Sequence, residues 1–117
     1  MNLNEALEAH ADWRYRFHDA IVNRRPVDVA TIARDDLCVL GRWLHGEAKS
    51  RYSTLKSYAA CHAEHAHFHR EAAKVADASN AGRYQEAVAM LSAPSNYAAA
   101  WITASFAIKA FMTEAGL

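Results

Sequence analysis

Two short segments of the 117-residue chain concentrate the side chains that could bind a metal or act as a nucleophile. The first, DDLCVLGRWLHGE over residues 35–47, places one cysteine among leucines and three residues before a glycine. The second, CHAEHAHFHR over residues 61–70, holds four histidines within eight residues. Imidazole nitrogen and thiolate sulfur are typical zinc ligands, so the two segments suggest a shared metal site.

Three histidines of the chain occupy positions that favour metal binding. His65 and His69 are four residues apart, so on a helix they lie on one face and their rings can reach a common point. Their face borders the predicted core, where neighbouring imidazoles without partners would be costly. His10 falls on the apolar stripe of the first predicted helix, one turn after Leu7, where an alkyl side chain would be usual.

Cys38 and Gly41 lie on a short helix that we predict over residues 37–45, with Asp35 or Asp36 as its N-cap. A glycine inside a helix costs about 0.8–1 kcal/mol relative to alanine, so Gly41 indicates the close approach of another backbone. Trp43 is expected to cover the resulting gap. The sulfur of Cys38 would then face the same interior position as the histidines.

The complete candidate set has four members: His10, Cys38, His65 and His69. Four mixed nitrogen and sulfur ligands suit a closed tetrahedral zinc (Zn²⁺) site with no position left for water. A catalytic zinc keeps such a position open, so we predict a site that stabilises, senses or switches rather than an enzyme.

The elements that must position these residues are predicted to be helices. Apolar periodicity predicts helices over 2–25 and 37–45, a long helix ending near residue 77, a helix over 83–92, and a last one from 95 or 96 to the C-terminus. A short helical turn is expected over 28–34. We expect one all-α domain over residues 1–117, an antiparallel four-helix-bundle-like fold with an additional short helix that carries the cysteine.

Composition excludes several classes of protein. Apolar residues make up 52% of the chain, which excludes a disordered protein. The 13 basic side chains balance 13 acidic ones, which argues against nucleic acid and anionic membranes as partners. Apolar runs are far shorter than the ~18 residues of a membrane span, and no signal segment is visible. We therefore expect a cytoplasmic protein without membrane insertion, in which the cysteines stay reduced.

Three motifs occur in order along the chain: His10 with Trp13; then Cys38, Leu40, Gly41 and Trp43; then His65 with His69. Together they resemble the chemoreceptor zinc-binding (CZB) domain family. The resemblance implies a homodimer that binds one zinc per subunit through three histidines and a cysteine. It also implies bacterial cytoplasmic signalling, where such domains are attached to chemoreceptor signalling rods or diguanylate cyclases. This chain carries neither attachment, which predicts a free-standing member or an excised piece.

Cys38 is the predicted switch of such a site. Zinc binding requires a deprotonated cysteine, so occupancy of the site depends on pH as well as on the level of free metal. Oxidants convert a thiolate to sulfenic acid and would remove this ligand, leaving the short helix free to move. The stimulus remains open between zinc level, oxidant and some other signal.

Other readings of the same residues remain open. Cys61 lies one turn before His65 and is the rival thiolate, although the family pattern assigns Cys38. His62 is expected to be partly exposed or adjacent to the site, and His18, His45 and His67 to lie on the surface. Rival functions are a metal-indifferent dimerisation module, a di-iron bundle with inward-facing carboxylates, and a hydrolase that uses Cys38.

Overall fold

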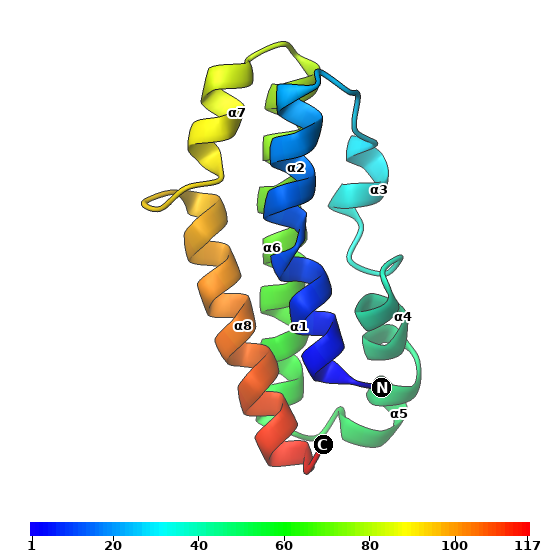
Figure 1. Ribbon diagram of the computed structural model, residues 1–117. Coiled ribbons are helices and arrows are strands. Elements are labelled where there is room, and N and C mark those ends of the chain that lie inside the picture. The colour runs from blue at the N-terminus through cyan, green and yellow to red at the C-terminus, as the bar shows by residue number, and fades with distance from the viewer.

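The structure, a computed structural model, describes residues 1–117 and consists of helices and the turns that join them (Figure 1). The helices are α1 (Leu3–Ala11), α2 (Trp13–Val22), α3 (Val29–Ala33), α4 (Val39–His45), α5 (Glu47–Tyr52), α6 (Lys56–Asn80), α7 (Tyr84–Met90) and α8 (Asn96–Ala115). The expected all-α fold is confirmed.

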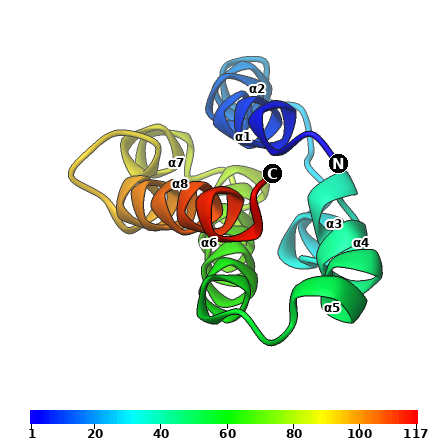
Figure 2. The ribbon, with the colours of Figure 1, turned by 90° about the horizontal axis from the view of Figure 1, so that it is seen from below.

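The helices form four neighbouring columns when the molecule is viewed along its long axis (Figure 2). One column stacks α1 on α2, a second contains the short helices α3 to α5, a third is α6, and the fourth stacks α7 on α8. Successive columns run up and down alternately (Figure 1). This is the expected antiparallel bundle, with the cysteine-bearing helix inside the second column.

Two predicted helices begin or divide differently in the structure. The single helix expected over 2–25 is two helices that meet at Asp12, where Tyr15 N–H donates to Asp12 O at 3.0 Å, an i→i−3 contact. Aspartate has a low helix propensity, and the Asp12 side chain makes no capping hydrogen bond here. The helix expected over 37–45 begins at Val39, so neither Asp35 nor Asp36 is its N-cap. Cys38 is the N-cap, which corrects its predicted place inside the helix.

The remaining boundaries follow local capping signals. Asp28 caps α3 by accepting from Thr31 N–H at 3.2 Å, and Ser95 caps α8 by accepting from Ala98 N–H at 3.1 Å. The long helix extends to Asn80 rather than to residue 77. The polar segment before it contains α5, which is too short for apolar periodicity to reveal.

The core has two apolar clusters with a polar layer between them. The first cluster is centred on Phe17, Phe68 and Val75, and the second on Leu44 and Phe111. Along the first column His10 stands between Ala6 of the second cluster and Phe17 of the first. Along α6, His65 likewise stands between Cys61 and Phe68. The fold therefore places imidazoles from two columns at one level.

The helices also differ from membrane spans in their combination of length and apolar character. No helix is both long enough and apolar enough to cross a bilayer.

Candidate metal centre

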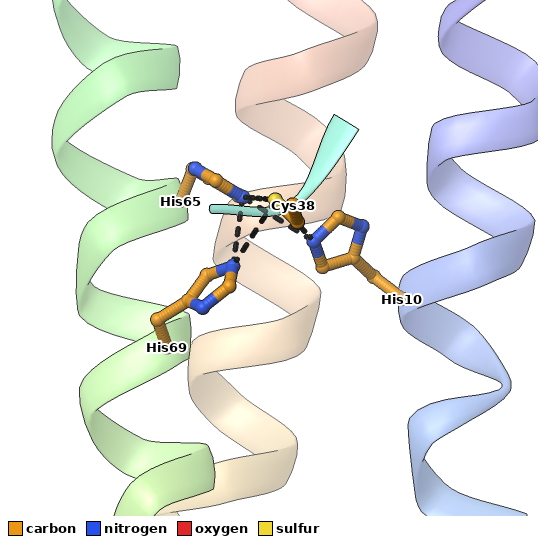
Figure 3. A group of neighbouring side chains, drawn as sticks. All are labelled: His10, Cys38, His65 and His69. Atoms are coloured by element: carbon orange, nitrogen blue, oxygen red, sulfur yellow. Dashed lines mark hydrogen bonds between the residues drawn. The ribbon is translucent and has the colours of Figure 1, made fainter. Parts of the chain in front are cut away.

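The four predicted ligands meet at a single point of the polar layer (Figure 3). His10 lies near the end of α1, Cys38 caps α4, and His65 and His69 lie one turn apart on α6. The three histidines are 1–3% exposed, and Cys38 is half-buried. Their nearest nitrogen and sulfur atoms all lie within 4.8 Å of one another.

The distances between these atoms suit a tetrahedral ion. Cys38 Sγ lies 3.3 Å from His65 Nε2 and 3.6 Å from each of His10 Nε2 and His69 Nε2. His65 Nε2 lies 3.2 Å from His10 Nε2 and 2.9 Å from His69 Nε2. Around a tetrahedral zinc, the usual bond lengths separate two nitrogens by about 3.3 Å and nitrogen from sulfur by about 3.6 Å. The observed edges agree within about half an ångström.

Hydrogen bonds to backbone carbonyls orient two of the rings. His10 Nδ1 lies 2.8 Å from Ala6 O, and His69 Nδ1 lies 2.9 Å from Ile32 O. A carbonyl only accepts, so each Nδ1 carries the proton and each Nε2 presents a lone pair to the centre. This is the usual arrangement of metal-bound histidine. The donor set therefore fits a cation, which would satisfy lone pairs that otherwise face one another.

Burial keeps the imidazoles in the form that binds metal. It lowers the pKa of His10 to about 4 and the pKa of His65 to about 2, and it also lowers the pKa of His69. Burial raises the pKa of the Cys38 thiol, while the Gly41 N–H that donates to Sγ at 3.3 Å opposes this effect. A bound cation would displace the thiol proton.

The chain matches the family model described as the chemoreceptor zinc-binding domain over residues 10–76. The match begins at His10 and includes all four converging residues. The chain belongs to this family. Its cofactor is accordingly Zn²⁺, and the family is one of regulatory sensory domains rather than of enzymes. No curated protein and no solved structure matches the chain.

The two tryptophans of the CZB motifs have different roles. The Trp13 ring lies 5.2 Å from the His10 ring and 4.9 Å from the His69 ring, between centroids, so it covers the candidate metal centre. Trp43 instead packs on Tyr52 and Phe111 in the second apolar cluster. The expectation that Trp43 fills the space beside Gly41 is therefore wrong.

The backbone of Asp35 occupies the space beside Gly41. A Cβ atom on residue 41 would lie 1.7 Å from Asp35 O and 2.7 Å from Asp35 C. The close backbone approach predicted from the glycine is confirmed, and the segment that approaches is the turn leading to Cys38. This contact fixes the position of the cysteine relative to the helix that it caps.

Cys61 does not join the donor atoms of this CZB domain. Its side chain is fully buried in the second apolar cluster, and burial raises the pKa of its thiol to about 12. His67 lies apart from the centre as well, on the outer side of α6 between Glu64 at 3.7 Å and Glu71 at 3.5 Å. Of the two cysteines, only Cys38 faces the three imidazoles.

A cleft gives access to the centre from one side. Its volume is about 590 Å³, and it lies between α1 and the start of α4. Both His10 and Cys38 contribute to its walls. Among the four converging residues Cys38 is the least buried.

Proposed function

We propose that this CZB domain is a zinc-dependent sensory domain of bacterial signalling, with His10, Cys38, His65 and His69 as its ligands. The convergence of three Nε2 atoms and one Sγ atom is the observation that carries the proposal. Four protein ligands leave no position for a reactive water, which favours sensing over catalysis. The donor group contains no carboxylate, so the di-iron alternative lacks its usual ligands. Elemental analysis should find zinc; iron, or no metal, would contradict the proposal.

Cys38 is the ligand through which the site would respond to oxidants. The three histidines lie within α1 and α6, whereas Cys38 stands at the start of a seven-residue helix, where it lines the cleft together with His10. With hydrogen peroxide, the thiolate sulfur attacks one oxygen and the O–O bond breaks. The other oxygen leaves as hydroxide, and the oxidised sulfur is left as sulfenic acid. This group binds zinc poorly, so the ion leaves and the segment before α4 is released.

Peroxide titration of the zinc-loaded protein tests this role of Cys38. We expect the wild-type chain to release its zinc, detected with a chromogenic chelator, and Cys61→Ser to release it equally. Cys38→Ser should retain zinc more weakly through the histidines and show no peroxide-dependent release. Because serine also caps helices well, this variant should keep its fold. Equal peroxide-dependent release from Cys38→Ser and wild type would contradict the proposed switch.

Homodimerisation is the second part of the proposal, and the exposed face of α8 supports it. Ile102 is 52% exposed and Phe106 is 69% exposed, and their four-residue spacing puts them on one side of the helix. We expect Phe106→Glu to convert a dimer into a monomer in light-scattering measurements. Val22→Glu, at an equally exposed apolar position on α2, should leave the mass unchanged. A dimer that survives Phe106→Glu would place the interface elsewhere.

The proposed output is cytoplasmic signalling through chemoreceptor rods or diguanylate cyclases. The family resemblance supports this, since its members are regulatory domains. Loss of zinc would free the segment before α4, and that movement would be passed to the attached or associated signalling protein.

A further inference from the structure

A second group of metal-binding side chains lies next to the zinc centre. It contains Asp35 from the turn before α4, His45 from the last residue of α4, and His62 from α6. Asp35 Oδ2 lies 3.1 Å from His45 Nε2, and the His45 and His62 ring centroids are 4.5 Å apart. One donor atom from each side chain lies within 4.8 Å of the others.

An ion pair accounts for only part of this arrangement. Asp35 and His45 can pair by themselves, but such a pair gives no reason for His62 to lie beside them. One divalent cation can instead bind a ring nitrogen of each imidazole together with the carboxylate. Two imidazoles and one carboxylate are a recurrent donor set for Zn²⁺, Fe²⁺ and related ions, with the remaining positions open.

We propose that Asp35, His45 and His62 form a second, solvent-accessible site for a divalent metal ion, completed by water. The side chain of His45 is 40% exposed and that of Asp35 is 24% exposed, so ions enter directly from solution. Three protein ligands in a partly hydrated position bind less tightly than four in a buried one. The second site therefore fills only after the first.

Binding of an ion at the second site would affect the zinc centre, because the residues of the two sites lie close together along the chain. Asp35 precedes Cys38 by three residues and its carbonyl packs on Gly41, while His62 precedes His65 by three residues on α6. An ion bound at the second site thus ties the segment that carries Cys38 to α6 without using the sulfur. When metal is abundant, this second tie would hold the segment in place even after Cys38 is oxidised.

Calorimetric titration of the zinc-loaded protein with further Zn²⁺ tests the site. We expect a second, weaker binding step that disappears in Asp35→Asn and in His62→Ala, while the first zinc stays bound. His67→Ala is the matched control, because it removes another partly exposed histidine from α6, and it should retain both steps. Circular dichroism spectra of all variants check that the fold is kept.

Cobalt(II) titration of the metal-free chain tests the second site independently of the ligands proposed for the first site. The first equivalent should give thiolate-to-metal charge transfer and strong tetrahedral bands, and the second only weak bands. Cys38→Ala should lose the charge transfer and keep the weak step. The inference is overturned if the wild-type chain binds a single ion, if the weak step survives Asp35→Asn and His62→Ala, or if His67→Ala also removes it.

Discussion

Removal of zinc is expected to lower the midpoint of thermal unfolding by about 15 °C. An ion that binds the folded chain alone, at a free concentration about 1,000 times its dissociation constant, stabilises the fold by about 4 kcal/mol. In a domain of this size each kcal/mol shifts the midpoint by roughly 4 °C. The measurement is thermal unfolding by circular dichroism, with excess zinc and then with a strong chelator.

The structure explains why the polar layer depends on the ion. The Nδ1–H groups of His10 and His69 donate to backbone carbonyls, so each Nε2 carries a lone pair and can only accept. Without a cation, these two buried Nε2 atoms need hydrogen-bond donors. The thiol of Cys38 has one proton to donate. His65 Nδ1 is buried and has no hydrogen-bond partner. His65 can therefore donate a second hydrogen bond within the layer only when its proton is on Nε2. The polar layer between the two apolar clusters would therefore be held by weaker contacts without the ion.

Two substitutions on α6 control for effects of the chelator itself. His65→Ala removes a proposed ligand, so its unfolding midpoint should be low and nearly the same with zinc and with chelator. His67→Ala removes a histidine outside the centre and should keep the full difference. An unchanged wild-type midpoint after verified zinc removal would show that the ion does not stabilise this fold.

Much of the fold and of the zinc centre could be predicted from the sequence because the signals are local. The i, i+4 spacing of His65 and His69 fixes their relation on any helix, and the apolar stripe of α1 fixes the direction of His10. The last helix is predicted to begin at Ser95 or Asn96, and α8 begins at Asn96 with Ser95 as its N-cap. Each of these signals depends on neighbours within one turn.

Other features depend on contacts between distant segments, and the sequence does not reveal them. The sequence predicts Cys38 within a helix because Asp35 and Asp36 are typical N-cap residues, but the Cys38 sulfur caps that helix by accepting from Gly41 N–H. The exposure of Phe106 on α8 follows only from which face of the helix packs on α6. His45 and His62 show no common spacing with Asp35, because the three come from separate segments that only the fold brings together.

Gly41→Ala is expected to destabilise the protein and weaken zinc binding, although alanine is the better helix former. Helix propensity alone would make the substitution favourable by about 1 kcal/mol. The added Cβ, however, would lie 1.7 Å from Asp35 O and 3.1 Å from Asp36 Cα, and both are backbone atoms that no side-chain rotation can move. Such overpacking costs about 1–3 kcal/mol or more, so the steric effect outweighs propensity.

The clash displaces the segment that leads to Cys38, so the loss should extend to the metal. We expect zinc affinity, measured by competition with a chromogenic chelator, to fall about tenfold or more, the range typical when groups that orient a ligand are disturbed. Gly82→Ala is the matched control: its positive φ of 80° makes alanine strained by roughly 1 kcal/mol, yet its Cβ would meet nothing within 4 Å. That variant should lose stability and keep its zinc affinity. If Gly41→Ala also kept its affinity, the Asp35 contact would not be what positions the sulfur.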